Sequence, residues 1–138
     1  MTDLGHWSCK IPIPEEPYGF IYEIENELTG RRYIGKKQMT AVRKLPPLKG
    51  KKRKRLKTVD TDWRTYTSSS NELNNDIVKY GKDKFTFTIL AFCNSKWELA
   101  YMESKLQFEN DVLLTEKYYN GIINLRIGKA PKSFLEKV

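Results

Sequence analysis

Two short β-rich segments constrain the fold of this chain more than any other feature of its sequence. Phe20–Ile24 and Arg32–Gly35 combine β-branched and aromatic residues, and the polar link Asn26–Gly30 separates them. Gly30 can adopt a positive φ, which tight connections between antiparallel strands often require. The pattern therefore predicts an antiparallel β-hairpin.

A third strand and two helices are expected next along the chain. Lys36–Lys44 contains no helix breaker and predicts a short helix. Ser69 followed by Glu72 has the spacing of a capping box, which predicts the start of a second helix that ends at Gly81. Phe85–Ile89 alternates apolar and polar residues and predicts a strand.

The last helix is expected from Ser95 to about Phe108, because Ser95 and Glu98 repeat the capping-box spacing. Prolines exclude a helix in Thr2–Pro17, and Ile122–Ile127 is expected to be a short strand or an extended segment. Together these elements predict an α+β fold of the broad α/β class, with a small three-stranded antiparallel sheet flanked by helices.

Basic residues concentrate in one part of the chain. The net charge is +8, yet residues 31–57 contain thirteen basic residues and no acid, whereas the remainder has a net charge of −5. Such a block attracts polyanions and gains affinity by releasing counterions from phosphates. We therefore expect contact with nucleic acid, and a solvated basic loop is the alternative. Prolines and Gly50 predict that Lys44–Asp62 is a flexible insertion.

The side chains expected to contact nucleic acid are basic residues of this stretch and two aromatic residues after it. They are Lys37, Lys51, Lys52, Arg53, Lys54, Arg55, Lys57, Trp63 and Tyr66. The basic side chains would bind the phosphate backbone irrespective of base sequence. The two aromatic rings would stack on bases, but packing in the core is an equal alternative for them.

Phenols and one carboxylate are the candidate catalytic groups. Tyr22 and Tyr33 lie on the paired strands of the predicted hairpin, where simple packing is the commoner role. Glu103 shares a helical stripe with Leu99 and Leu106, so it does not lie on an open charged face. A carboxylate in that position is either paired structurally or holds a metal ion. Together with basic side chains, these groups suit phosphodiester hydrolysis.

Phe20-Ile21-Tyr22 and Tyr33-Ile34-Gly35 resemble the paired signature of the GIY-YIG nuclease family, with Phe20 in the usual place of a glycine. Four more residues follow in the order expected for that family: Lys36, Arg43, Glu103 and Asn120. The resemblance spans about Gly19–Asn120. The histidines of many homing members are absent, and Tyr66 is the candidate to replace the first of them.

The resemblance implies a homing-endonuclease-like DNA endonuclease that uses one Mg²⁺ or Mn²⁺. Glu103 would hold the metal, and Tyr22 would act as the general base, with its pKa lowered by Tyr33, Lys36 and the metal. Arg43 would stabilise the charge of the phosphorane transition state. Asn120 would orient the other groups or the backbone of the site.

The expected substrate is double-stranded DNA. A non-catalytic nucleic-acid-binding module is the alternative function, and an RNA-binding, ribosome-associated protein is a weaker one. We expect one domain over residues 1–138, with a core at 17–127 and the basic insertion at 44–62. Met1–Pro12 lacks the apolar run of a signal peptide. No membrane partner is therefore expected, and the expected location is the cytoplasm, that of a host if the chain is phage-encoded.

Overall fold

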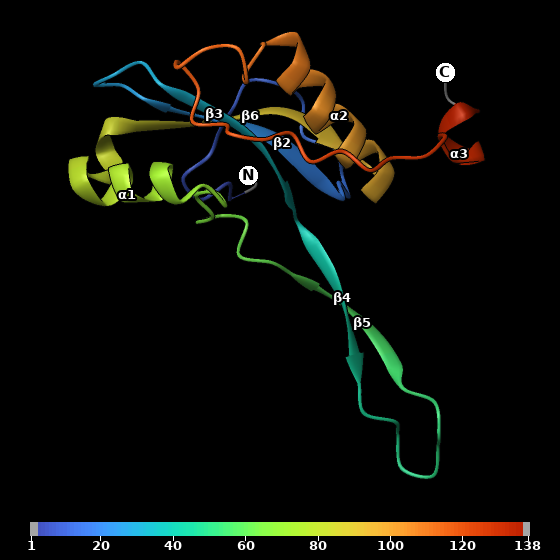
Figure 1. The fold of residues 1–138 in the computed structure, drawn as a ribbon. Helices are drawn as coiled ribbons and strands as arrows, with labels where there is room; N and C mark the ends of the chain where they lie inside the picture. The colour runs from blue at the N-terminus through green and yellow to red at the C-terminus, as the bar shows by residue number, and fades with distance from the viewer. Residues whose placement is uncertain (1–2, 137–138) are drawn as a thin grey trace.

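A four-stranded sheet with a helix on either side forms the body of the protein (Figure 1). The computed structural model describes residues 3–136. The strands, in their spatial order, are β1 (Ser8–Cys9), β6 (Phe85–Cys93), β2 (Gly19–Asn26) and β3 (Arg32–Gln38). The last three are antiparallel neighbours, and β1 adds a short parallel edge. The predicted α+β class, the hairpin and the third strand are confirmed, whereas β1 was not predicted.

The two faces of the sheet carry separate clusters of apolar side chains. Phe20, Tyr22 and Ile24 of β2 lie on one face and are fully or almost fully buried. Ile21 and Ile34 lie on the other face, where they pack with residues of the helix α2 (Lys96–Glu109). Because six of the eight residues of β2 are buried, this strand forms the middle of the core.

The helix α1 (Asn71–Tyr80) begins one residue later than the capping-box spacing predicts. Ser70, not Ser69, is the N-cap, and its hydroxyl accepts a hydrogen bond of 3.3 Å from the backbone N–H of Leu73. The hydroxyl of Ser69 lies 3.3 Å from that of Tyr33 instead. Gly81 ends the helix with a φ of 96°, as predicted.

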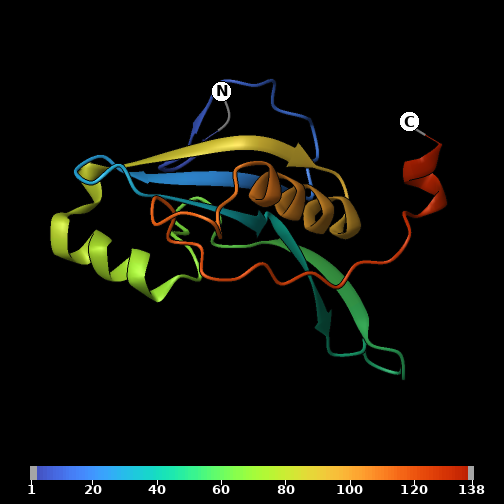
Figure 2. The same cartoon turned by 45° about the horizontal axis from the view of Figure 1, so that its top comes forward.

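The N-terminus of α2 is as predicted. The Ser95 hydroxyl accepts a hydrogen bond of 3.1 Å from the backbone N–H of Glu98. The Glu98 carboxylate in turn accepts one of 2.7 Å from the backbone N–H of Asn94. This cap fixes the start of the helix that carries Glu103, and α2 covers the Ile21–Ile34 face of the sheet (Figure 2).

The predicted helix at Lys36–Lys44 is wrong. Its first residues continue β3, and the rest form β4 (Thr40–Leu45), which pairs antiparallel with β5 (Arg55–Asp60). Thr40 and Val42 are β-branched and favour a strand, and β5 supplies the backbone partners for it. The two strands project from the sheet as an isolated ribbon, which we call the arm (Figure 1).

The arm replaces the flexible insertion expected at Lys44–Asp62. Its tip turns at Leu48–Lys51, where the N–H of Lys51 donates to the carbonyl of Leu48 at 2.8 Å and Gly50 has a φ of 82°. Its base is held by Thr61, whose N–H donates to the Met39 carbonyl at 3.0 Å and whose hydroxyl donates to the Gln38 carbonyl at 2.6 Å.

The C-terminal part runs without strands of its own. Ile122–Ile127 joins no sheet, so of the two predicted states the extended segment is the one observed. Short helical turns occur at η1 (Lys82–Lys84) and α3 (Lys132–Leu135). Among residues 3–136, no helix has the length and the apolar character needed to cross a membrane.

Candidate active site

Three tyrosine side chains pack together on the face of the sheet opposite α2, and we call them the tyrosine cluster: Tyr22, Tyr33 and Tyr66. The ring of Tyr22 lies 6.1 Å from that of Tyr33 and 6.2 Å from that of Tyr66, measured between centroids. Tyr22 is only 1% exposed, whereas the other two are half-buried. The strand pairing predicted from the sequence therefore brings both hairpin tyrosines together, and Tyr66 joins them from the segment after the arm.

Local backbone geometry explains how Tyr22 reaches this position. The pairing of β2 with β6 shifts register between Ile21 and Tyr22, an irregularity that can redirect a side chain. On the other side, Tyr22 lies directly opposite Gly35 of β3. A Cβ atom at Gly35 would be 2.5 Å from the Tyr22 hydroxyl oxygen, so only glycine leaves room for the phenol.

Replacing Gly35 with alanine is therefore expected to destabilise the fold by about 1–3 kcal/mol, the usual cost of overpacking. The added methyl group would also meet Tyr33 Cε2 at 2.8 Å, so both phenols would have to move. Gly128→Ala is the control, because a Cβ atom there meets nothing within 4 Å. Urea unfolding measures the change, and equal stability of the two variants would contradict this account of Gly35.

Glu103 extends from α2 towards the same site. Its side chain is 17% exposed, and one carboxylate oxygen lies 3.9 Å from the Lys36 ammonium nitrogen. Burial raises the pKa of Glu103 above its usual value, and the Lys36 charge and a backbone hydrogen bond from Lys36 oppose that shift. The negative charge of the carboxylate is also one of the smaller causes that raise the pKa of all three clustered phenols.

The protonation of Tyr22 differs from the expectation. Burial, and then the neighbouring Tyr33, Tyr66 and Glu103, raise the pKa of the Tyr22 phenol well above its ordinary value. Tyr33 was expected to lower this pKa, which is wrong, because a second phenol adds negative charge when it ionises. The chain alone therefore keeps Tyr22 as a neutral hydrogen-bond donor.

Lys37 belongs to the site, although the sequence placed it among the phosphate-binding residues. Its ammonium nitrogen lies 4.1 Å from the centroid of the Tyr66 ring and 2.8 Å from a carboxylate oxygen of Asp62. Asp62 follows the arm, so this ion pair joins the base of the arm to the cluster. Asp62 and Ser69, which lies against Tyr33, were not predicted, since only the folded chain brings them near β3.

Asn120 holds the backbone of β3. Its side-chain oxygen accepts a hydrogen bond of 3.0 Å from the N–H of Ile34, and its side-chain nitrogen donates one of 2.8 Å to the Ile34 carbonyl. The side chain of Gln107 on α2 donates to the same carbonyl at 3.0 Å. Because Ile34 lies between Tyr33 and Gly35, these bonds fix the strand that carries the site.

Two residues expected in functional contacts lie elsewhere. Arg43 is exposed on β4, roughly 20 Å along the chain from Lys36 at the rise of an extended strand. Trp63 is 2% exposed, and its carbonyl accepts a hydrogen bond from Trp7, so its ring is core packing and not a stacking platform. His6, the one histidine, stacks on Phe87 and takes no part in the cluster.

The remaining predicted nucleic-acid contacts all lie on the arm. They are exposed in the free chain: Lys51, Lys52, Arg53, Lys54, Arg55 and Lys57. Residues 51–54 belong to the tip, and the last two belong to β5. The arm therefore concentrates the basic stretch on one projecting element, apart from the tyrosine cluster.

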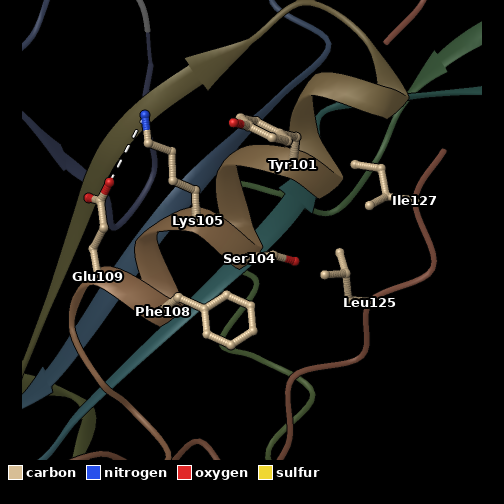
Figure 3. A pocket seen from close by; sticks show the side chains of 7 residues that line it. All are labelled: Tyr101, Ser104, Lys105, Phe108, Glu109, Leu125 and Ile127. Carbon is tan, nitrogen blue, oxygen red and sulfur yellow. Dashed lines mark ion pairs between the residues drawn. The ribbon is translucent and has the colours of Figure 1, made fainter. Parts of the chain in front are cut away.

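An apolar hollow of the surface lies away from this chemistry (Figure 3). It measures about 340 Å³ and lies between the outer side of α2 and the C-terminal segment, lined mainly by Tyr101, Phe108 and Leu125. None of the candidate catalytic residues lines it. The candidate site is thus the region around β3 where the tyrosine cluster, Glu103 and the two lysines that follow Gly35 lie, with Tyr22 buried and Lys36 exposed.

The comparisons with known proteins identify one family. A family model described as "Putative endonuclease segE, GIY-YIG domain" matches residues 7–123 of the chain. The match covers β1, the tyrosine cluster, the arm, Glu103 and Asn120. No curated protein and no solved structure matches the chain.

Proposed function

The chain belongs to the GIY-YIG nuclease family, and from that premise we propose that it is a homing-endonuclease-like DNA endonuclease that hydrolyses phosphodiester bonds with one divalent metal ion. The observation that carries the proposal is that three phenols pack together beside β3, and that the charge of one partly buried carboxylate, paired with the Lys36 ammonium, acts on all three of them. These groups come from four separate parts of the chain, and packing alone does not require a buried carboxylate beside them.

The residues of the site fit a single hard cation. Among residues 3–136, no group of three or more histidine, cysteine or acidic side chains is arranged to hold a metal. Mg²⁺ keeps several of its waters and binds through one or two carboxylates, so Glu103 by itself is a sufficient anchor. When bound, Mg²⁺ or Mn²⁺ supplies a Lewis acid that withdraws charge from a phosphate oxygen and acidifies water.

Tyr22 is the proposed general base. The negative charge of Glu103 is one of the causes that raise its pKa. A cation bound to Glu103 would neutralise this charge and remove its contribution to the pKa of Tyr22, so that the phenol would lose its proton more easily. Tyr33 and Tyr66 are more exposed and would position the attacking water and the scissile phosphate at the rim of the cluster.

Lys36 takes the role that the family resemblance assigned to Arg43. Its ammonium is 45% exposed and lies beside Glu103, so it can turn to a bound phosphate. A cation held next to the reacting phosphate stabilises the charge that develops in the transition state. Lys37, paired with Asp62, would hold Tyr66 in place and would meet the DNA at the base of the arm.

Plasmid nicking tests the proposed activity. We expect the full chain to nick supercoiled DNA in Mg²⁺ and to be inactive in EDTA, and Tyr22→Phe to lower the rate by roughly 10²–10³-fold. Since the pKa of Tyr22 is raised, the rate should increase with pH beyond neutrality, and this increase should disappear in the variant. Tyr101→Phe, an exposed tyrosine on α2, is the control. Nicking at full rate in EDTA would refute the metal requirement.

A non-catalytic DNA-binding module is the second candidate. The observation in its favour is the separation of the basic arm from the tyrosine cluster, because binding by the arm does not depend on the cluster. Tight binding of duplex DNA without nicking in Mg²⁺ or Mn²⁺ would select this function. Equal affinity for duplex RNA would favour RNA as the substrate instead.

A further inference from the structure

The two faces of the arm are unlike each other. Side chains alternate between the faces of a ribbon, and the cross-strand pairs define which residues lie together. On one face Arg43 is opposite Lys57, and Leu45 is opposite Arg55, so we call it the basic face. The opposite face carries the pairs Val42–Thr58 and Lys44–Leu56, and Asp60 lies at its base. Three basic side chains and no acid therefore lie on one face.

The basic face carries unbalanced charge in the free chain. Arg43 and Lys57 are exposed and directly opposite each other, an arrangement that is unfavourable for like charges on paired strands. Within residues 3–136 neither of them forms an ion pair. Arg55 has only a hydrogen bond of 3.3 Å to the carbonyl of Pro46. A polyanion against this face would remove the repulsion.

The dimensions of the arm indicate which kind of polyanion can bind its basic face. A six-residue strand is roughly 20 Å long, and paired strands lie about 4.8 Å apart. The major groove of B-DNA, about 12 Å wide, admits a two-stranded ribbon without deformation, whereas the minor groove, about 6 Å wide, must be widened to take one. The major groove of duplex RNA is deep and narrow and excludes side chains, and its wide minor groove is shallow. The major groove of B-form DNA is therefore the groove that fits the arm without deformation.

We propose that the arm enters the major groove of duplex DNA with its basic face towards the bases, so that Arg43 and Lys57 contact base edges and the tip contacts phosphates. Arginine and lysine are the side chains that pair with guanine in this groove. This inference rests on the proposed function for the identity of the substrate. It assigns Arg43 to DNA recognition, where the family resemblance assigned it to catalysis.

The base of the arm connects recognition to the site. Thr61 fixes the arm to the end of β3, and the ion pair of Lys37 with Asp62 lies beside Tyr66. The arm is therefore held at a set place relative to the tyrosine cluster. Arg43 is roughly 20 Å along the chain from Lys36, and this length equals about six base pairs at 3.4 Å for each. The cleaved phosphodiester bond is therefore expected to lie to one side of the DNA segment that the arm contacts.

Matched substitutions on the two faces test the orientation of the arm. In a full chain that also carries Glu103→Gln, so that the duplex stays intact, Arg43→Gln and Lys57→Gln should each weaken duplex binding about ten-fold, because each removes a contact to a base edge. Lys44→Gln removes the same charge from the opposite face of the same strand and should change the affinity far less. Fluorescence anisotropy with a labelled duplex at several salt concentrations measures all three.

Groove-specific competitors complete the test. Methyl green, which occupies the major groove, should displace the chain, whereas netropsin, which occupies the minor groove, should not. Displacement by netropsin, or equal losses in Arg43→Gln and Lys44→Gln, would overturn the proposal, and so would duplex RNA binding with the same dependence on the basic face. If the wild-type chain fails to nick DNA but binding follows the predicted pattern, the proposed activity fails and the groove contact stands.

Discussion

Replacing Glu103 with glutamine is expected to lower the rate of DNA nicking by roughly 10²–10³-fold. Glutamine keeps the size of the side chain but loses the negative charge that would hold a divalent cation next to the phenols. The carboxylate is 17% exposed and is supported by α2 packing, so the substitution should leave the fold intact. Single-turnover nicking of a supercoiled plasmid in Mg²⁺ measures the loss.

The same substitution is expected to raise thermal stability in metal-free buffer at neutral pH. Burial raises the pKa of Glu103, so the folded chain binds this proton more tightly than the unfolded chain does. The protonated Glu103 carboxyl therefore stabilises the folded chain at low pH, and this stabilisation is lost as the pH rises through the pKa of Glu103 in the folded state. Glutamine does not ionise, so the variant does not lose stability in this way. Loss of the exposed Lys36 partner should matter little.

Glu109→Gln is the control for both effects. Glu109 lies on the same helix, its side chain is 54% exposed, and its partner is Lys105 at 4.0 Å. This variant should nick DNA at the wild-type rate and unfold at the wild-type temperature. A Glu103→Gln chain that nicks as fast as the control would refute the role of Glu103.

Replacing Asn120 with alanine is expected to lower the free energy of unfolding by about 2 kcal/mol, the cost of one buried backbone group left without a partner. The Ile34 N–H loses its only side-chain acceptor, whereas the Ile34 carbonyl keeps the hydrogen bond from Gln107. The nicking rate should fall by more than the loss of folded protein explains, because the backbone of β3 between Tyr33 and Gly35 loses the side chain that fixes it. Urea unfolding and nicking at a temperature where the variant is folded separate the two effects.

Asn124→Ala is the matched control, because Asn124 is exposed in the same C-terminal segment. Its stability should stay within about 0.5 kcal/mol of the wild type. If Asn120→Ala matched this control in both assays, the hydrogen bonds to Ile34 would have no part in supporting the site.

The sequence correctly predicted those helices and strands that depend on interactions between residues close together in the chain. The hairpin that pairs Tyr22 with Gly35 follows from two β-rich segments with a short link. The start of α2 follows from Ser95 and its capping partner, and the helical spacing correctly placed Glu103 on a partly buried stripe. These features depend on residues only a few positions apart, which is why the sequence was sufficient.

The position of Arg43 could not be predicted in the same way. Its spacing after Tyr33 resembled the family pattern, and the sequence predicted a helix there, which would rise 1.5 Å per residue and keep Arg43 nearer the sheet. In the structure Thr40–Leu45 is a strand that rises roughly 3.3 Å per residue and leaves the sheet. The strand forms because Arg55–Asp60, on the other side of the tip, pairs with it. The sequence of Lys36–Lys44 alone does not indicate this partner.

Long-range contacts also explain the residues of the site that were missed. Asp62 and Ser69 reach Lys37 and Tyr33 only because the arm returns the chain to β3. Tyr66 was predicted as a base-stacking residue, as core packing or as a substitute for a histidine, and the structure packs it against Tyr22. Such contacts join residues more than twenty positions apart and become visible only in the folded chain.

Binding of Mn²⁺ by the full chain, followed by electron paramagnetic resonance in the presence of a short duplex, tests the central claim most directly. The claim is that Glu103 and the tyrosine cluster surround one divalent cation at the reacting phosphate. We predict one bound Mn²⁺ per chain, lost in Glu103→Gln and retained in Glu109→Gln. Equal binding of Mn²⁺ by the two variants would contradict it.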